Sequence, residues 1–320
     1  MRIGVIIPAF DVAPWIGQAI ASVIRQTHRD WALIVVDDGS TDATPDIIAR
    51  CPDARITLLR QPNQGVSAAR NRGLAAVDPA IEALLFLDGD DWLEPDALAI
   101  LAAGLDAAPQ AVAAAGGYAR IGVDGIRRPV CVHVAGDDLR RLMVRNLFVN
   151  GGHVLIRRWA AEAVGGFDPA LSYGEDWHYW VRLVARGPFA ATPVARPLLN
   201  VRERPGSAFH TMARQPERFR LCLDAIHRDP MVQARLAPAE RAALRRRADA
   251  ENAWVIGREL IRHGDPMAGR PWLLRSLRAA PSAKRLGLVG LAWAQAGPFR
   301  PYAASASTSR RGTACTGIAA

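Results

Sequence analysis

Residues 83–91 read ALLFLDGDD, an apolar run that leads into three aspartates and a glycine. Consecutive apolar residues are typical of a strand that is buried on both faces of a parallel sheet. The run therefore places Asp88, Asp90 and Asp91 where a central strand leaves the sheet. Mg²⁺ and Mn²⁺ commonly use one or two protein carboxylates and complete their coordination with water and substrate phosphates. Asp and Gly also form turns and helix caps, so this stretch alone leaves both a metal site and a turn open.

Strand-like and helix-like segments alternate on both sides of this run. We expect strands at 3–7, 33–36, 56–59, 83–87, 111–121 and 153–157, and helices at 14–25, 45–50, 66–76, 95–107 and 175–185. Strand followed by helix, repeated, predicts an α/β domain with a doubly wound, Rossmann-like and mostly parallel sheet.

Acidic residues follow three of the expected strands. Asp11 comes after the first strand, Asp37 and Asp38 close the second, and Asp88 and Asp90 close the fourth. In a doubly wound sheet, ligands bind outside the carboxyl ends of the strands. We therefore expect these carboxylates to converge on one site.

Two common nucleotide-binding motifs are absent from the sequence. Residues 8–14 read PAFDVAP where a dinucleotide fold would carry Gly-x-Gly-x-x-Gly, and there is no Gly-x-x-x-x-Gly-Lys loop. A diphosphate at the acidic strand ends would therefore have to be held through a metal ion and arginines. The four cysteines are scattered and form no Cys-x-x-Cys pair, which argues against a zinc or redox site.

The net charge of +9 is unevenly distributed along the chain. Residues 1–200 carry 19 basic and 22 acidic side chains, whereas residues 201–320 carry 21 and 9. Such an excess favours an anionic partner, either lipid headgroups or nucleic acid. We expect peripheral contact with an anionic membrane and no nucleic acid. Without a long apolar run or a signal peptide, the sequence predicts a cytoplasmic protein, located in part at the inner face of the membrane.

Five short motifs occur in a characteristic order. They are PAFD at 8–11, VDDGSTD at 36–42, NQG at 63–65 with ARNRG at 69–73, the DXD-containing LDGDD at 87–91, and GEDW at 174–177. Together they resemble the motif series of the family 2 glycosyltransferases, over roughly residues 1–210. The resemblance implies a GT-A fold, a nucleoside-diphosphate sugar as donor, a divalent cation (Mg²⁺ or Mn²⁺) and inversion at the anomeric carbon. The implied acceptor is a hydroxyl group of a glycan, a lipid-linked sugar or a cell-surface polysaccharide precursor.

The resemblance also suggests roles for residues near the donor. It assigns Pro8, Phe10 and Asp37 or Asp38 to the nucleotide, although Asp37 and Asp38 could equally form an Asx-type turn. Arg70 would reach the nucleotide or its phosphates with a planar donor fork, while Arg72 should face solvent.

For the two acidic motifs, the resemblance makes Asp90 the principal metal ligand, with Asp88 on the metal or the ribose. Asp91 is expected to be structural. Asp176 would be the general base that accepts the acceptor proton, next to Glu175 in the substrate site. Carboxylates in the first turn of a helix are also favoured by the helix dipole alone.

One motif departs from the family pattern. Family members often carry a histidine in a Tyr-Arg-x-His-x-x-Ser motif, whereas residues 201–207 read VRERPGS, with Arg204 at the histidine position. We expect Arg202 and Arg204 to contact the diphosphate, and His210 is the alternative. Trp180 is expected in the core, whereas Trp177 could lie in the core or stack against an acceptor sugar.

These observations predict three regions: a GT-A domain at 1–210, a helical, arginine-rich region at 211–302 and a disordered tail at 303–320. The predicted activity is metal-dependent, inverting transfer of a sugar to a hydroxyl group. A non-catalytic relative that binds a sugar nucleotide or glycan is the alternative. A nucleotidyltransferase is disfavoured because its glycine-rich, basic loop after the first strand is missing.

Overall fold

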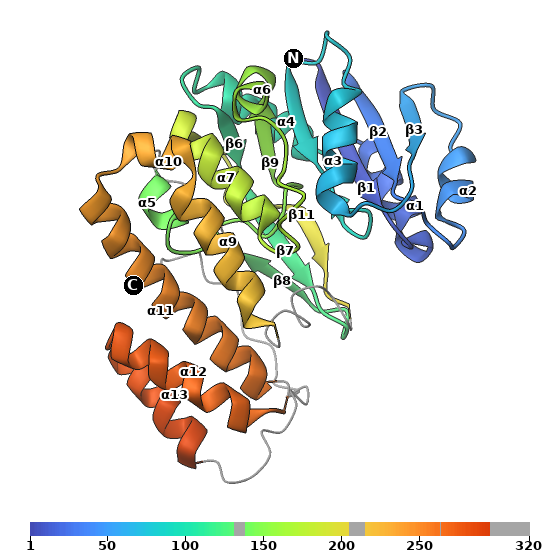
Figure 1. The fold of residues 1–320 in the computed structure, drawn as a ribbon. Coiled ribbons are helices and arrows are strands. Elements are labelled where there is room, and N and C mark those ends of the chain that lie inside the picture. The colour runs from blue at the N-terminus through green and yellow to red at the C-terminus, as the bar shows by residue number, and fades with distance from the viewer. Residues whose placement is uncertain (131–137, 205–214, 263, 295–320) are drawn as a thin grey trace.

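The computed structural model describes residues 1–130, 138–204, 215–262 and 264–294. A seven-stranded sheet with the order β10-β6-β9-β4-β1-β2-β3 forms its centre (Figure 1). The strands are β1 (Ile3–Ala9), β2 (Trp31–Asp37), β3 (Ile56–Arg60), β4 (Ala83–Phe86), β6 (Ala113–Ala115), β9 (Val154–Arg157) and β10 (Phe189–Ala191). The four strands β1 to β4 are parallel, and β9 is antiparallel to β4 and β6. The prediction of an α/β fold with a mostly parallel sheet is confirmed.

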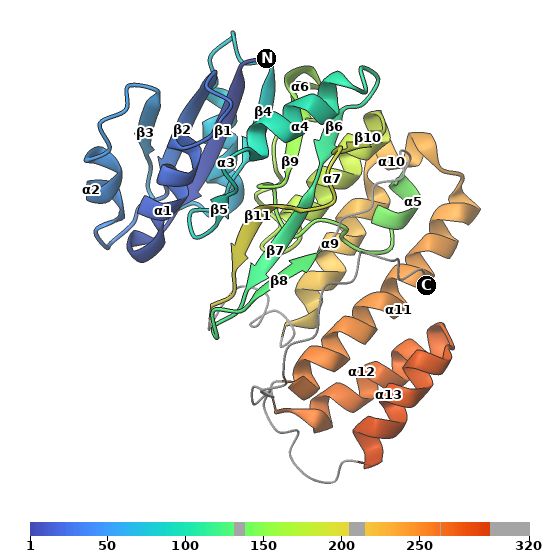
Figure 2. The same cartoon turned by 180° about the vertical axis from the view of Figure 1, so that it is seen from behind.

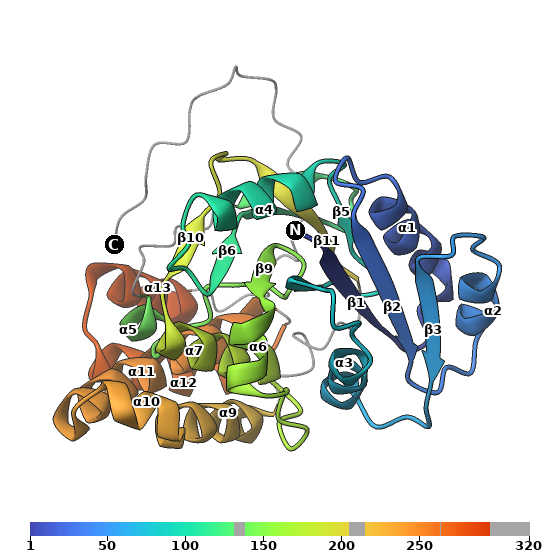
Figure 3. The same ribbon diagram turned by 90° about the horizontal axis from the view of Figure 1, so that it is seen from above.

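Helices cover both faces of this sheet (Figure 3). On one face lie α1 (Ala13–Ile24) and α4 (Ala97–Asp106), and on the other lie α3 (Val66–Ala75), α6 (Arg158–Val164) and α7 (Glu175–Arg186). The short α2 (Thr44–Ala49) packs beside α1.

Strand β1 is buried on both sides, as its unbroken apolar sequence requires. Its side chains alternate between two cores: Val5 and Ile7 contribute to the α1–α4 side, and Ile6 contributes to the α7 side. Helix α3 approaches β1 closely because Gly73 has no side chain; a Cβ at this position would lie 2.4 Å from Cγ2 of Ile6. This contact fixes the position of α3, which carries Arg70.

A second, four-stranded sheet has the order β5-β11-β7-β8. Its strands are β5 (Trp92–Leu93), β11 (Pro197–Arg202), β7 (Gly117–Ile121) and β8 (Arg127–Val130). Antiparallel pairing of β11 with β5 joins Asn200 to Trp92. The end of β11, with its arginines, is thereby brought next to residues 88–91.

The remaining described helices are α5 (Leu139–Leu142), α9 (Pro216–Arg228), α10 (Pro230–Arg235), α11 (Pro238–Arg262), α12 (Pro266–Ala279) and α13 (Ala283–Ala294) (Figure 2). Leu223 and Ile226 of α9 belong to the same hydrophobic core as α7, and α12 and α13 pack beyond α11. The boundary near residue 210 stays a prediction, and the tail at 303–320 lies outside the described residues. Among the described helices, none combines the length and the apolar character that a membrane span needs.

Candidate active site

The aspartates of residues 88–91 lie directly beyond the carboxyl end of β4. The backbone N–H of Leu87 still donates to the carbonyl of Ile6 at 3.0 Å, and the N–H of Asp91 donates to the carbonyl of Asp88 at 3.1 Å. The chain therefore leaves the sheet in a turn whose side chains are presented at the strand edge. The structure shows the turn, which carries the acidic cluster, and the metal site stays a prediction.

Arg70 connects the DXD motif to the start of α7. Its Nη2 donates to Oδ1 of Asp88 and its Nη1 donates to Oε1 of Glu175, both at 2.9 Å. The arginine side chain is only 5% exposed, whereas its partners Asp88 and Glu175 are 29% and 15% exposed, so the guanidinium is the part shielded from water. A buried guanidinium with two carboxylate partners holds both carboxylates in fixed positions. We call this pair of ion pairs the Arg70 joint. Residues 88 and 175, far apart in the chain, thus belong to one site.

Asp90 pairs with the arginine that stands at the family's histidine position. The Nε of Arg204 lies 2.6 Å from Oδ2 of Asp90, and the guanidinium lies 4.6 Å from the ring centroid of Trp15. Arg202 donates from Nε to the carbonyl of Asp90 at 3.2 Å and from Nη2 to Oε1 of Gln18 at 2.6 Å. Two arginine side chains therefore border the acidic cluster.

Asp91 has a structural position, as expected. Its Oδ1 accepts from the backbone N–H of Arg202 at 2.9 Å, and its Oδ2 accepts from Nδ2 of Asn150 at 2.5 Å. Burial, with the charges of Asp90 and Asp88, raises the pKa of Asp91 well above its ordinary value. The side chain ties β11 to the DXD turn.

Asp176 lies in the first turn of α7, next to Glu175. Its Oδ1 accepts from the backbone N–H of Trp177 at 2.6 Å, and Nδ2 of Asn146 lies 3.4 Å from its Oδ2. Burial, together with the negative charge of Glu175, raises the pKa of Asp176 to about 7, against the opposing effect of Arg70. A carboxylate with a pKa near neutrality is suited to proton transfer.

The turn before α7 depends on a glycine and on α9. Gly174 has a φ of 69°, in the left-handed region, and a Cβ there would lie 2.4 Å from Sγ of Cys222. Cys222 also contacts the carbonyl of Gly174 at 3.4 Å. Helix α9 therefore supports the segment that presents Glu175 and Asp176.

Asp37 and Asp38 are buried at the end of β2, and both are already hydrogen-bonded. Asp37 accepts from the backbone of Ser40 at 3.1 Å and from Nε of Arg60 at 3.2 Å. Asp38 accepts from Nε2 of Gln61 and from two backbone N–H groups, those of residues 64 and 65. Asp38 thus anchors the loop before α3 through long-range bonds. The local turn bond is the one from Ser40 to Asp37, and Asp37 has fewer hydrogen-bond partners than Asp38.

The remaining sequence-derived candidates fall into accessible and buried groups. Phe10 is 45% exposed, whereas Pro8 is buried within β1. Arg72 is exposed, as expected. Trp180 is buried as expected, and Trp177 is buried too, with its Nε1 donating to the carbonyl of Leu142 at 2.6 Å. Trp177 is therefore a core residue and not a stacking platform. His210 lies outside the described residues.

Sequence reasoning missed Asn146 and Asn150, which contact Asp176 and Asp91, and Trp15 and Gln18, which contact the two arginines. The first two lie in a segment without regular periodicity, so no local pattern singled them out. Trp15 and Gln18 lie on α1, where the sequence favours a core face.

The acidic cluster offers two carboxylates to a divalent cation. Within the described ranges, no three His, Cys, Asp or Glu side chains are placed to hold a metal on their own. Asp88 and Asp90 supply two carboxylates, the number that Mg²⁺ or Mn²⁺ commonly takes when phosphates and waters complete its coordination. Burial and the charge of Asp88 raise the pKa of Asp90, so positive charge at this point is favourable. The donor set fits such a cation.

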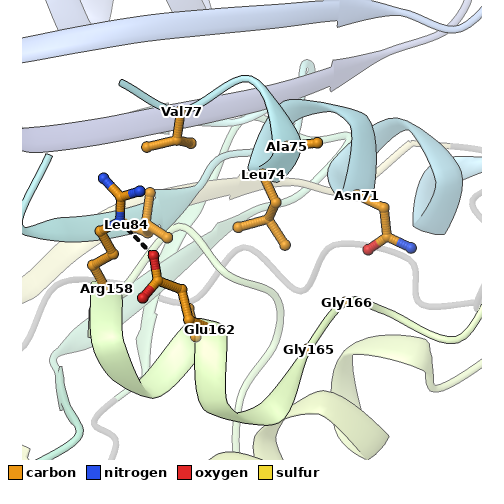
Figure 4. A pocket seen from close by; sticks show the side chains of 10 residues that line it. Asn71, Leu74, Ala75, Val77, Leu84, Arg158, Glu162, Gly165 and Gly166 are labelled. Carbon is orange, nitrogen blue, oxygen red and sulfur yellow. Dashed lines mark hydrogen bonds and ion pairs between the residues drawn. The ribbon is translucent and has the colours of Figure 1, made fainter. Parts of the chain in front are cut away.

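A separate cavity of about 410 Å³ lies between α3 and α6 (Figure 4). Leu74, Val77 and Leu84 line it, and the ion pair of Arg158 with Glu162 lies at its rim. None of the carboxylates at the strand ends contributes to this cavity. It is therefore distinct from the acidic site.

Comparison with known proteins identifies the family of this chain. Residues 4–163 match the family model described as "Glycosyl transferase family 2". The chain belongs to glycosyl transferase family 2. The resemblance inferred from the motif series is thereby confirmed.

Family 2 relatives with sequence similarity cover part of this chain. "Glycosyltransferase GlyA" of Streptococcus pneumoniae is 39% identical over 97 residues, which are 30% of this chain and 14% of that protein. "Succinoglycan biosynthesis protein ExoW" of Rhizobium meliloti is 40% identical over 101 residues, 30% of this chain and 32% of that protein. The chain matches less than one third of the length of either relative.

Solved structures share the fold over most of this chain. S. aureus TarS 1-349 aligns with a TM-score of 0.60 at 17% identity, over 90% of this chain and 83% of that one. The mannosyltransferase PcManGT of Pyrobaculum calidifontis, in complex with GDP-Man and Mn²⁺, aligns with a TM-score of 0.58 at 20% identity, over 94% and 81%. These alignments show the GT-A fold.

The Arg70 joint predicts a measurable loss of stability. Arg70→Met would leave the carboxylates of Asp88 and Glu175 without their shared, shielded partner, which we expect to lower the free energy of unfolding by roughly 3 kcal/mol. Urea unfolding followed by circular dichroism measures this change. Arg72→Met, on the exposed side of the same helix, is the matched control, and equal stability of the two variants would contradict the joint.

Proposed function

We propose that the chain is an inverting glycosyltransferase that moves a sugar from a nucleoside diphosphate to an acceptor hydroxyl. The observation that carries this proposal is the pair of ion pairs from Arg70 to Asp88 and Glu175. They hold Asp88 close to the start of α7, where the pKa of Asp176 is raised to about 7. This proximity supports a diphosphate site next to a candidate base.

In the proposed reaction, Asp176 accepts the proton of the acceptor hydroxyl as the hydroxyl oxygen attacks the anomeric carbon. The bond between that carbon and the diphosphate oxygen breaks at the same time, and the nucleoside diphosphate leaves with the electron pair. A single displacement of this kind inverts the anomeric configuration and needs no nucleophilic carboxylate. Because the carboxylate is the active form, Asp176 works as a base above its pKa.

Positive charge must offset the charge that develops on the leaving diphosphate. Arg202 and Arg204, which border the acidic cluster, are placed to contribute it. Asp88 and Asp90 would hold a divalent cation, which when bound supplies Lewis-acid stabilisation of the diphosphate. Arg70 keeps Asp88 and Glu175 in position, and its shielded setting favours this role over direct contact with the nucleotide.

The relatives suggest which substrates to test. The solved structures of the neighbours include complexes with UDP, UDP-GlcNAc and GDP-Man, and ExoW is named for succinoglycan biosynthesis. We propose a nucleotide sugar of this kind as donor, bound through Phe10 and Asp37 at the β1 and β2 ends. A glycan, lipid-linked sugar or polysaccharide precursor is the proposed acceptor.

A donor screen tests the proposal. UDP- and GDP-sugars are added with Mn²⁺, and thermal unfolding is followed, because a ligand that binds the folded state raises its melting temperature. The donor that stabilises the protein is then incubated with hydroxyl acceptors, and the anomeric configuration of the product is read by NMR. We expect an inverted product. Stabilisation without any turnover would favour the non-catalytic alternative, and a retained configuration would contradict the mechanism.

A further inference from the structure

Helix α13 has an apolar face that no described residue covers. Its inner side packs on α11 and α12 through Leu288, Val289 and Ala292. On the outer side, Leu286 is 62% and Trp293 43% exposed, whereas Leu291, 54% exposed, lies about 140° around the helix from Leu286. The spacing from Leu286 to Trp293 is seven residues, two helical turns, so both side chains lie on one stripe.

The neighbouring helix α12 extends this surface. Met267, at its start, is 72% exposed. The side chain of Arg270 connects the two helices, because its Nε donates to the carbonyl of Ala292 at 3.0 Å and its guanidinium lies 5.4 Å from the centroid of Trp293. The tryptophan is thus held at the surface in a defined orientation. We call Met267, Leu286 and Trp293 the apolar patch.

The charge on the two helices that carry the apolar patch is entirely positive. Helices α12 and α13 contain five basic residues and no acidic residue. Among the five, Arg275, Arg278 and Lys284 are exposed. Exposed Trp and Leu beside Arg and Lys is the composition of helices that lie in the interface of an anionic membrane.

We propose that α12 and α13 form a docking surface for an anionic lipid bilayer, with the apolar patch inserted at headgroup depth and the three exposed basic residues on the phosphates. A second copy of this chain fits less well. A symmetric contact would bring Arg275, Arg278 and Lys284 of two copies against each other, and no acidic side chain on either helix offsets the repulsion.

The position of this surface is compatible with catalysis at a membrane. Figures 1 and 2 show α12 and α13 at the end of the molecule opposite to the N-terminus, the end toward which β1 runs. The acidic site lies at the carboxyl ends of β1 and β4. Docking through α12 and α13 therefore orients the site edge toward the bilayer. The docking itself does not depend on the proposed activity.

Vesicle sedimentation tests the docking surface. The probe is a phosphatidylcholine vesicle with about one third phosphatidylglycerol, compared with pure phosphatidylcholine, at low and high salt. We expect binding only to the anionic vesicle at low salt. Arg275→Gln/Arg278→Gln/Lys284→Gln should lower the partition coefficient at least about ten-fold. The control Arg25→Gln/Arg29→Gln/Arg50→Gln removes three exposed arginines elsewhere and the same net charge, and it should bind nearly as the parent does.

The apolar contribution is tested by a second pair of variants. Leu286→Gln/Trp293→Gln should also lower the partition coefficient about ten-fold. Leu221→Gln/Trp159→Gln, with side chains 52% and 53% exposed on other helices, is the matched control. Unchanged melting temperatures show that the variants are folded.

Equal loss in test and control variants, or no vesicle binding by the parent, would overturn the proposal. So would a dimer in light scattering that Leu286→Gln/Trp293→Gln converts to monomer, because the apolar patch would then bind a second copy.

Discussion

Asp176→Asn is expected to lower the rate of sugar transfer by about 10²- to 10⁴-fold, the range for loss of a general base. Asparagine preserves the size of the side chain and its bond with the backbone of Trp177, but it cannot accept the acceptor proton. Donor binding should stay within about three-fold of the parent, because the base acts on the acceptor. Steady-state transfer assays and calorimetric titration of the donor measure the two quantities. Unchanged transfer would disprove the base assignment.

Asp46→Asn is the matched control, since Asp46 is an exposed carboxylate in the first turn of α2. It should transfer sugar at the parent rate.

The melting temperature gives a second readout for Asp176. A folded-state pKa raised from 3.8 to about 7 means that ionisation of Asp176 lowers stability as pH rises through this window. At pH 8, Asp176→Asn should therefore melt at a higher temperature than the parent, and near pH 4 the difference should disappear.

The same pKa gives the transfer reaction a predicted pH profile. Asp176 must be ionised to act, so kcat/KM should rise with pH up to about 7 and level off above it. Glu175→Gln removes the negative charge that raises this pKa, while its amide oxygen can still accept from Arg70. The acid limb should then move to lower pH.

The sequence predicted that the aspartates converge on one edge of the sheet because parallel strands have a fixed polarity. Asp37 is the last residue of β2 and Asp88 lies just beyond β4, and β1 pairs with both strands, so the aspartates lie at one edge of the sheet. Periodicity alone was sufficient for this step. The same apolar patterns predicted many of the surrounding elements, but the single strand expected at 111–121 was wrong, because β6 and β7 divide it between the two sheets.

The contacts within the site could not be predicted in this way. Arg70 and Glu175 are separated by 105 positions, and their ion pair depends on how α3 and α7 pack on the same face of the sheet. The burial of Trp177 could not be predicted either. It depends on the packing of α7 against the segment with Leu142, whose carbonyl accepts from the Trp177 ring. Contacts of this kind are set by tertiary packing, which local sequence does not encode.

Substitution of Asp90 in the DXD motif is expected to have the second large effect on activity. Asp90→Asn should lower metal-dependent release of nucleoside diphosphate at least about 100-fold, because the cation loses a charged ligand and the acidic cluster loses the charge that favours it. The stabilisation of the protein by Mn²⁺ with donor, read as a shift in melting temperature, should disappear as well. Asp96→Asn is the control, since Asp96 also pairs with an arginine, Arg196, but is more exposed.

A variant of Arg204 distinguishes two roles for Asp90: ligand of the metal ion, or anchor of the Arg204 side chain only. In this structure Arg204 neutralises Asp90, so a cation that binds Asp90 must compete with the guanidinium. Arg204→Gln should therefore bind Mn²⁺ at least as tightly as the parent, yet bind the nucleoside-diphosphate sugar more weakly, because the diphosphate loses a positive partner. If Asp90 only anchored Arg204, Asp90→Asn and Arg204→Gln would behave alike toward Mn²⁺. Opposite shifts in manganese affinity, measured by electron paramagnetic resonance titration, are the expected result.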